Sequence, residues 1–231
     1  MKKCCVLFSG GIDSTTALYW ALNAYGTVFA LTFDYGQRHA VEIQSSRKLS
    51  QKLNISQTIL TLDLQQASGS ALTDLSIPLP EFRSAEEIEP GVPPTYVPFR
   101  NGIFLSMAAA WAEVHDIRDI ICGFNVVDSP GYPDTTRGFA DAMEKAINIG
   151  TKASAEKSAF RIRTPFVGKK KSEIIQRGIA LNADYSHSIS CYAGKEIPCL
   201  RCSSCLLRQR AWEEVGRRDP LLERLEKEKK L

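Results

Sequence analysis

A glycine pair between an apolar run and a helix-like stretch is the feature that most constrains this chain. Residues 8–14 read Phe-Ser-Gly-Gly-Ile-Asp-Ser. Residues 4–8 are typical of a short buried strand, and the apolar periodicity after the loop predicts a helix that ends near Gly26. Glycines let backbone N–H groups turn toward a ligand, and a helix start carries positive partial charge. The arrangement therefore favours the binding of phosphate oxygens.

The loop has no lysine, so it is not the Gly-x-x-x-x-Gly-Lys-Ser/Thr loop that binds β- and γ-phosphates. It resembles the pyrophosphate loop of ATP pyrophosphatases, which cut ATP between the α- and β-phosphates and adenylate a substrate oxygen. An ordinary glycine turn is the competing interpretation, and the strand–helix context argues against it. The residues expected to bind ATP are Phe8, Ser9, Gly10, Gly11, Ile12, Asp13, Ser14, Thr15, Thr16, Ala17 and Leu18.

The length and composition indicate an ordinary globular protein. A chain of 231 residues with 44% hydrophobic and 24% charged residues suits one α/β domain with a small appendage. The net charge of +3 is too small to argue for a nucleic-acid or membrane surface. The apolar run near the N-terminus is too short for a signal peptide or a membrane span, so we expect a cytoplasmic protein.

Strand-like and helix-like segments alternate along the chain, which predicts a doubly wound parallel sheet of the Rossmann-like α/β class. Ligands then lie at the carboxyl ends of the strands, in the loops after the first, second and fourth strands. We expect strands at 4–8, 28–33, 58–62 and 119–123, and helices at 40–53, 102–114 (capped by Asn101), 137–149 and 171–181. The charged helical run 223–230 is expected to be a solvated terminus.

Residues 66–100 interrupt this alternation with six prolines and form a long irregular insertion. Long ordered loops in compact domains are usually functional, so the insertion is expected to fold over a substrate. We assign residues 1–185 to a nucleotide-binding and catalytic domain and residues 186–231 to a cysteine-rich region with a C-terminal helix packed on it.

Four of the seven cysteines lie close together near the C-terminus. Cys191, Cys199, Cys202 and Cys205 have the two-residue spacers that let neighbouring sulfurs reach one ion, which favours a structural zinc site. An iron–sulfur cluster is the alternative that this spacing leaves open. The other three, Cys4, Cys5 and Cys122, lie in apolar runs and are expected to be small buried hydrophobic residues.

Further motifs narrow the superfamily to one family. They are Thr-Phe-Asp-Tyr-Gly-Gln-Arg-His at 32–39, Thr-Tyr-Val-Pro-Phe-Arg-Asn at 95–101, Gly-Tyr-Pro-Asp at 131–134, Lys-Ser-Glu-Ile at 171–174 and Ser-Cys-Tyr at 190–192. With the four cysteines, these motifs make the chain similar to the 7-cyano-7-deazaguanine synthase family from about residue 4 to about residue 220. It departs from the usual family pattern at Thr135-Thr136, at Ser188-Ile189 and at Leu200, where the family commonly has glycine.

The resemblance implies an ATP-dependent ligase of queuosine biosynthesis and purine metabolism. Such an enzyme converts 7-carboxy-7-deazaguanine and ammonia to the nitrile through an adenylated carboxylate and an adenylated amide. By resemblance the catalytic residues are Asp13, Lys171, Arg38 and His39. Asp13 holds Mg²⁺ or caps its helix, and Lys171 binds phosphate. Arg38 binds phosphate or the substrate carboxylate, or holds the insertion, and His39 carries a proton or is a packing residue. The substrate residues implied are Tyr96, Arg100, Asn101, Asp128, Tyr132 and Asp134.

The implied cofactors and partners are structural Zn²⁺, Mg²⁺, ATP as co-substrate, and free ammonia or an ammonia-supplying partner. Trp111 and Trp212, together with the apolar helix 102–114, suit a homodimer without nucleic-acid or membrane contacts. Two alternatives remain. One is an adenylating tRNA thiolase or sulfurtransferase of the same superfamily, and the other is a non-enzymatic zinc-ribbon regulator that binds nucleic acid.

Overall fold

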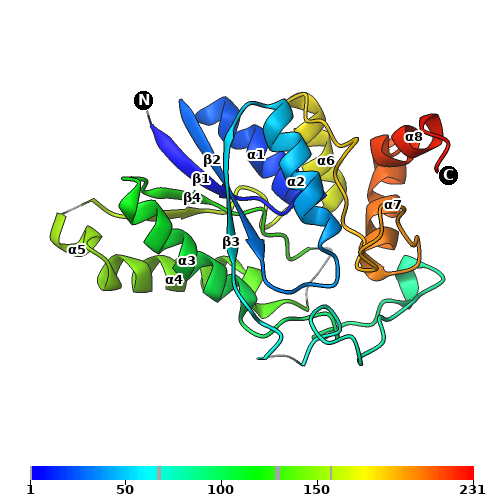
Figure 1. Cartoon of the computed structure of the whole chain (residues 1–231), viewed down its shortest axis with the longest axis horizontal. Helices are drawn as coiled ribbons and strands as arrows, with labels where there is room; N and C mark the ends of the chain where they lie inside the picture. The colour runs from blue at the N-terminus through cyan, green and yellow to red at the C-terminus, as the bar shows by residue number, and fades with distance from the viewer. Residues whose placement is uncertain (1, 67–68, 128–130, 157) are drawn as a thin grey trace.

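The computed structural model describes residues 2–66, 69–127, 131–156 and 158–231 (Figure 1). Within these residues a five-stranded parallel sheet has the order β3-β2-β1-β4-β5, which confirms the expected doubly wound α/β fold. The strands are β1 (Lys3–Leu7), β2 (Thr27–Asp34), β3 (Ser56–Thr61), β4 (Asp119–Ile121) and β5 (Arg161–Arg163). The three-residue strand β5 was not predicted, because Arg-Ile-Arg is too short for a strand pattern.

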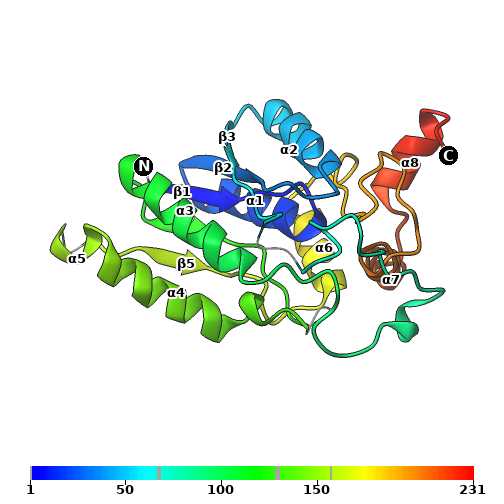
Figure 2. The same cartoon turned by 60° about the horizontal axis from the view of Figure 1, so that its bottom comes forward.

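Helices cover both faces of the sheet (Figure 2). One face carries α1 (Ile12–Ala24), α2 (Val41–Lys52) and α6 (Lys171–Ala180). The other face carries α3 (Arg100–Val114) and α4 (Arg137–Gly150), which continues toward the short α5 (Ala153–Glu156). None of the helices in the described residues is long and apolar enough to cross a membrane.

The buried residues of β1 show why helices must cover both faces of the sheet. Cys4 and Val6 are fully buried in the cluster that contains the apolar residues of α1 and α6. Cys5 is fully buried in the opposite cluster, beneath α3 and α4. Side chains alternate across a strand, so a strand that is apolar on both faces belongs in the middle of a covered sheet. The expectation that Cys4, Cys5 and Cys122 are small buried residues is confirmed.

The strand order reverses between β1 and β4, which places a crevice at their carboxyl ends. β1 pairs with β2 on one side and with β4 on the other, so the loops after these three strands meet at one edge. This is the edge where the sequence predicted the chemistry.

Helix α3 begins differently from the expectation. Its N-cap is Phe99, whose φ of 53° is left-handed, and Asn101 lies inside the first turn. The predicted cap at Asn101 is wrong, because Asp134 supplies the capping acceptor instead: its carboxylate accepts the backbone N–H of Asn101 at 2.9 Å. The Asn101 side chain donates to the Asp134 carbonyl at 3.2 Å.

The insertion has one short regular element in its described residues, the 3₁₀ turn η1 (Ala85–Glu87). Its outer part is fastened to the cysteine-rich region. The backbone N–H of Phe82 donates to the Arg201 carbonyl at 2.9 Å, and Glu81 lies 3.2 Å from the Arg201 guanidinium. The insertion therefore spans from the sheet edge to the C-terminal region, as Figure 1 shows below the sheet.

The C-terminal region holds α7 (Ser203–Val215) and α8 (Pro220–Lys227). The buried Arg208 of α7 pairs with Asp219, the N-cap of α8, and also donates to the Ser188 carbonyl at 2.9 Å. Leu225 is fully buried and one face of α8 packs on the cysteine-rich region, so the run 223–230 is a solvated terminus only on its outer face. The boundary at residues 185 and 186 stays a prediction.

Candidate functional site

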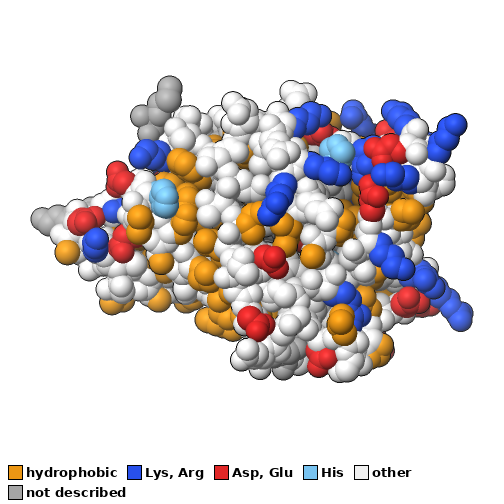
Figure 3. Space-filling view, in the orientation of Figure 1, with side chains coloured by type: hydrophobic (Ala, Val, Ile, Leu, Met, Phe, Trp, Pro, Cys, Tyr) orange, Lys and Arg blue, Asp and Glu red, His pale blue; other side chains and the backbone are white. Residues whose placement is uncertain are grey.

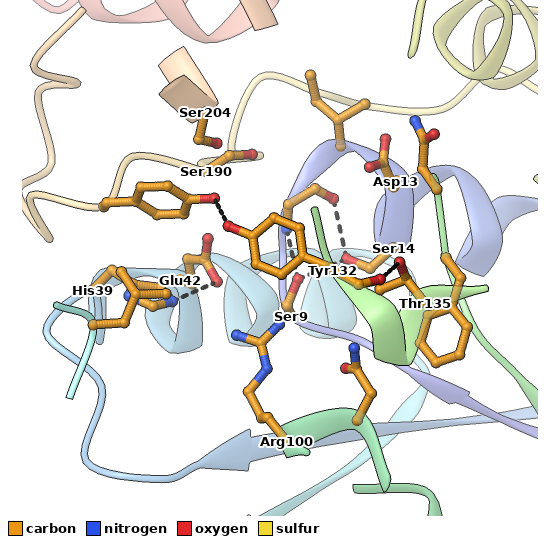
Figure 4. A pocket seen from close by; sticks show the side chains of 18 of the residues that line it. Ser9, Asp13, Ser14, His39, Glu42, Arg100, Tyr132, Thr135, Ser190 and Ser204 are labelled. Carbon is orange, nitrogen blue, oxygen red and sulfur yellow. Dashed lines mark hydrogen bonds and ion pairs between the residues drawn. The ribbon is translucent and has the colours of Figure 1, made fainter. Parts of the chain in front are cut away.

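A cavity of about 340 Å³ opens at the carboxyl edge of β1, β2 and β4 (Figure 4). The loops after these strands line it, together with the insertion at Ile88–Gly91 and Pro93 and the start of α7. Segments far apart in the sequence thus surround one space. The cavity lies where the sequence predicted the chemistry, at the loops after strands one, two and four.

The glycine pair shapes the loop at the bottom of the cavity. Gly10 has a φ of +91°, and a Cβ there would lie 2.8 Å from the Glu42 carbonyl oxygen. The position needs glycine for both reasons, its backbone conformation and the close approach of α2. The backbone N–H of Gly11 donates to Ser9 Oγ at 3.2 Å, and Ser9 Oγ lies 3.1 Å from Ser14 Oγ.

The predicted ATP-binding residues divide into two groups. Phe8, Ser9, Gly11, Ile12, Asp13 and Ser14 line the cavity. The lining found among the described residues leaves out Gly10, Thr15, Thr16, Ala17 and Leu18. Gly10 shapes the loop instead. Ala17 and Leu18 belong to the core beneath the sheet, and the Thr16 hydroxyl lies 2.6 Å from the Tyr185 hydroxyl. Thr16, Ala17 and Leu18 therefore anchor α1 rather than face the cavity.

Asp13 and Lys171 form an ion pair in the cavity wall. Lys171 Nζ donates to the two carboxylate oxygens at 2.7 Å and 3.0 Å. The two side chains are 22% and 15% exposed, so both remain open to a ligand. The Asp13 carboxylate points to α6, and among the described residues no side-chain hydrogen bond caps the start of α1. This arrangement favours a ligand-binding role over the capping alternative.

A chain of polar side chains forms the opposite wall. Arg100 Nη1 donates to Tyr35 Oη at 3.0 Å, Tyr35 Oη lies 3.4 Å from His39 Nε2, and His39 Nε2 lies 3.7 Å from the Glu42 carboxylate. Burial and, to a lesser degree, the nearby Arg100 guanidinium lower the pKa of His39 to about 3. A neutral imidazole suits hydrogen bonding; proton transfer by His39 stays a prediction.

Glu42 is the member of this wall that sequence reasoning missed. It lies in the first turn of α2 and lines the cavity, and burial raises its pKa to about 8. The sequence feature that could have identified Glu42 was its spacing from His39. Glu42 follows His39 by three positions at the start of a helix, and that spacing places both side chains on one helix face.

Arg38 has a different position from the one expected for a substrate ligand. Its guanidinium donates to the backbone carbonyls of Asp74 and Ile77 at 3.1 Å and 3.2 Å. The cavity lining in the described part of the chain does not include it. The alternative, that Arg38 holds the insertion, therefore has the better support, although it acts through carbonyl groups rather than a salt bridge.

Some of the residues predicted to bind the substrate line the described cavity, and others do not. Arg100, Asn101 and Tyr132 line the cavity. Among the described lining residues Tyr96 and Asp134 do not appear: the Tyr96 hydroxyl accepts the backbone N–H of Phe99, and Asp134 is buried at the start of α3. Asp128 lies outside the described residues.

Two of the residues that depart from the family pattern, Thr135 and Ile189, lie at or near the cavity. Thr135 lines the cavity, and its hydroxyl donates to the Tyr132 carbonyl at 2.8 Å. The backbone N–H of Ile189 donates to the Gly10 carbonyl at 3.1 Å, and its side chain is buried among the cysteines. Thr135 thus supports Tyr132 in the cavity wall, whereas Ile189 supports the glycine loop through its backbone.

The four clustered cysteines converge. The sulfur atoms of Cys191, Cys199, Cys202 and Cys205 lie within 4.8 Å of one another, a spacing that suits a tetrahedral zinc–thiolate site. The backbone N–H groups of Cys199 and Cys202 donate to the sulfurs of Cys191 and Cys199 at 3.2 Å and 3.3 Å. Hydrogen bonds from neighbouring thiols lower the pKa of Cys191, so the cluster favours a thiolate. The four residues fit a metal ion.

The cysteine cluster also supports the cavity. Tyr192 follows one cysteine, and Ser203 and Ser204 lie between two others; all three line the cavity. The insertion is fastened to the same segment through Arg201. A metal ion bound by the four cysteines would therefore stabilise one wall of the cavity. It would also stabilise the segment to which the insertion is fastened.

Comparison with known proteins gives consistent results. The family described as "Queuosine biosynthesis protein QueC" matches residues 3–216. A Clostridium kluyveri protein named 7-cyano-7-deazaguanine synthase is 46% identical over 223 residues, which cover 96% of this chain and 97% of that protein. A Thermoplasma volcanium protein of the same name is 44% identical over 220 residues, covering 95% and 90%.

A solved structure supports the fold alone. NMN synthetase from Francisella tularensis superposes with a TM-score of 0.52 at 17% identity, covering 97% of this chain and 82% of that one. The shared fold agrees with the Rossmann-like α/β class that the sequence predicted.

Proposed function

The chain belongs to the queuosine biosynthesis protein QueC family, and we propose on that premise that it is an ATP-dependent 7-cyano-7-deazaguanine synthase. It would convert 7-carboxy-7-deazaguanine and ammonia to the 7-nitrile, with ATP as the activating co-substrate. The observation that carries the proposal is one cavity that joins a pyrophosphate-type loop and the Asp13–Lys171 pair to an aromatic, hydrogen-bonding wall.

The first step needs the phosphate side of this cavity. A carboxylate on an electron-rich ring is a poor electrophile, because oxide is not a leaving group. One carboxylate oxygen attacks the α-phosphorus of ATP, the bond to the β-phosphate oxygen breaks, and pyrophosphate leaves. Ser9, Ser14 and the N–H groups at the start of α1 suit the pyrophosphate oxygens, and Lys171 offsets their negative charge.

The next steps insert nitrogen and remove oxygen. Ammonia attacks the acyl carbon, AMP leaves with the original carboxylate oxygen, and a proton is released, which gives the amide. The amide oxygen then attacks the α-phosphorus of a second ATP, and pyrophosphate leaves again. Loss of AMP and protons from this adduct leaves the nitrile. The cavity walls contribute mainly by positioning, which can supply several kcal/mol, on the order of 7–11 in well-oriented reactions.

The metal assignments belong to the same proposal. Mg²⁺ would offset phosphate charge when bound, and Asp13 is the carboxylate placed to hold it, directly or through water. The four cysteines would hold one structural Zn²⁺, because four protein sulfurs leave no open position for a substrate.

The thiolase alternative is not favoured. It needs a reactive thiol beside the ATP site, and Cys122 is the cysteine that lines the described cavity. Burial raises the pKa of Cys122 well above its usual value, so the thiol stays protonated and unreactive.

The nucleic-acid-binding alternative is also not favoured. Lys and Arg gather at the right of Figure 3, near α2 and α8, but acidic side chains are interleaved with them. Lys52, Arg224 and Lys230 pair there with Asp184, Glu228 and Glu196 at 2.7–2.8 Å. Ion pairing leaves less charge for phosphate groups, so we propose small-molecule substrates without direct nucleic-acid contact.

We also propose a cytoplasmic homodimer. Apolar side chains of α3, among them Met107 and Trp111, stay partly exposed beside the core, and Val114 at the end of α3 is 83% exposed. This face would be covered by a second copy. The oligomeric state follows from sedimentation of purified protein, and a monomer at micromolar concentration would contradict this part.

The test of the proposed function is pyrophosphate release from purified protein, ATP and Mg²⁺. Release should require 7-carboxy-7-deazaguanine, and mass spectrometry should detect the nitrile only when ammonia is added. Release that is indifferent to the deazapurine would contradict the assigned substrate.

A further inference from the structure

Glu42 is a carboxyl group inside the cavity with no assigned task. The carboxyl side chains among the described lining residues are Asp13, Glu42 and Glu89. Asp13 is engaged by Lys171, and Glu89 lies on the exposed insertion. The Glu42 carboxyl group lies 3.7 Å from the neutral imidazole of His39, and its side chain is only 13% exposed. A nearly buried carboxyl that opens into a cavity is suited to bind N–H donors of a ligand.

The position of Glu42 is fixed by the backbone. Its carbonyl group lies against Gly10, so the first turn of α2 is packed directly on the phosphate loop. Ser46, one turn further along α2, donates to the Ile43 carbonyl and accepts a hydrogen bond from Gln57 at 2.8 Å. The carboxyl group of Glu42 is therefore held on a rigid element rather than on a mobile loop.

Arg100 provides the complementary donor. It lies on α3, and Figure 4 shows its guanidinium and the Glu42 carboxyl group both extending into the same space. Among the described residues this guanidinium makes one hydrogen bond, from Nη1 to Tyr35 Oη. Its other N–H groups are available to an acceptor on a ligand.

The walls between them are aromatic. Phe104 stacks on Phe33 with ring centroids 4.1 Å apart, and the Arg100 guanidinium lies 5.7 Å from the Phe104 ring centroid. Tyr132 and Tyr192 approach each other across the cavity with hydroxyl groups 3.4 Å apart. Flat heterocycles stack on such surfaces while their edges are read by polar groups.

We propose that Glu42 recognises the N–H donor edge of the deazaguanine substrate, with Arg100 donating to the neighbouring ring carbonyl oxygen. The edge of a guanine-type base presents one carbonyl acceptor beside two N–H donors, the ring N1–H and the 2-amino group. Burial favours the neutral carboxyl group of Glu42, whereas the Arg100 guanidinium and the N–H donors of a bound base favour its carboxylate form. In the complex a guanidinium beside a carboxylate matches the order of groups on that edge. The inference rests on the proposed function and adds the residue that selects the base.

The inference also replaces an expectation from the sequence. Asp134 and Asp128 were the candidate acceptors, but Asp134 is buried at the start of α3 and does not line the described cavity, and Asp128 lies outside the described residues. Of the three acidic residues that line the described cavity, Glu42 is the one that is neither paired with Lys171 nor exposed on the insertion.

The test compares two substrates with four proteins. The substrates are 7-carboxy-7-deazaguanine and its analogue without the 2-amino group. The proteins are wild type, Glu42→Gln, Glu42→Asp and the control Glu144→Gln, whose carboxylate accepts the Ile162 N–H outside the cavity. The measurements are kcat/KM for each substrate and the KM for ATP and for ammonia.

The wild type and the control should prefer the amino substrate by about 10- to 100-fold, the range for a hydrogen bond to a charged group. Glu42→Gln should lower this preference to within about threefold and leave the KM values for ATP and ammonia unchanged. Glu42→Asp keeps the charge and should retain part of the preference, with a higher KM for the base. It also serves as the test variant if the amide variant does not fold.

Two results would overturn the inference. One is an unchanged substrate preference in both Glu42 variants. The other is a raised KM for ammonia at unchanged preference, which would assign Glu42 to the nitrogen source instead. Failure of the proposed function is distinguishable from both, because wild-type protein would then turn over neither substrate.

Discussion

The Asp13 carboxylate and the Lys171 ammonium group lie 2.7 Å apart at their closest, which joins the start of α1 to the start of α6. Residues separated by 158 positions thus meet beside the glycine pair. A carboxylate and an ammonium group at the edge of one phosphate loop can hold a metal ion and neutralise a leaving group, respectively. Their pairing keeps both side chains in place before a nucleotide binds.

Replacing Lys171 should therefore impair chemistry more than folding. We expect Lys171→Ala to lower kcat/KM for pyrophosphate release by about 10²–10³-fold, the range for loss of one transition-state charge partner. Since the pair is partly exposed, the free energy of unfolding should change by only about 1 kcal/mol or less. Lys169→Ala, an exposed neighbour, is the control. A similar loss in both variants would contradict a specific role for Lys171.

Replacing Leu200 with glycine should raise the stability of the protein. It lies between two cysteines with a left-handed φ of 57° and is 42% exposed, so a non-glycine residue is strained there without much burial in return. We expect Leu200→Gly to raise the free energy of unfolding by about 1 kcal/mol, measured by denaturant titration of metal-loaded protein. Ile197→Gly, a similarly exposed residue without positive φ, should not stabilise. A stabilisation of equal size at both sites would contradict the strain argument.

Removal of the metal ion should displace the cavity-lining residues that the cysteine cluster holds in position. The cysteine cluster holds Tyr192 and Ser203 in the lining and anchors the insertion through Arg201. We expect elemental analysis to find about one zinc per chain. Chelation should lower the midpoint of thermal unfolding and raise the KM for the deazapurine. Added zinc should restore both quantities. Full activity of metal-free protein would contradict this structural role.

The pH dependence of stability should reveal the buried Glu42. Burial raises its pKa from 4.5 to about 8 in the folded protein. Below pH 4.5 the carboxyl is neutral in both states; as pH rises toward 8 only the unfolded state ionises freely, so stability is lost over that window. Glu42→Gln removes this loss and should therefore raise the unfolding midpoint more at pH 8 than at pH 5.

His39 acts in the opposite sense and is the internal control for that comparison. Burial lowers its pKa from 6.5 to about 3, so the stability it contributes is lost as pH falls below 6.5. This loss is common to wild type and Glu42→Gln, and it cancels when their midpoints are subtracted. A midpoint difference that does not change with pH would contradict a neutral buried carboxyl.

Local sequence patterns were enough to predict the sheet and the loop. The apolar strands 4–8 and 28–33 and the glycine pair have signatures within a few residues, and the structure confirms them as β1, β2 and the lower wall of the cavity. The cysteines converge as their spacing predicted. Their two-residue spacers limit how far the sulfurs can separate.

What the sequence did not predict depends on long-range contacts. Asp134 caps α3 from 33 positions away, and Arg38 binds carbonyl groups of the insertion, which no local pattern encodes. Glu42 looks like an ordinary helix-start carboxylate until Arg100 and the phosphate loop are placed around it. Leu225 is buried only because the cysteine-rich region offers it a surface.

The most direct measurement follows oxygen from substrate to AMP. The carboxyl group of 7-carboxy-7-deazaguanine is labelled with ¹⁸O at both oxygens, and the AMP and nitrile formed with ATP, Mg²⁺ and ammonia are analysed by mass spectrometry. If both the carboxylate and the amide oxygen attack the α-phosphorus, two AMP molecules form per nitrile, and each carries one ¹⁸O. Nitrile formation with unlabelled AMP would contradict adenylation of the substrate, which is the central claim.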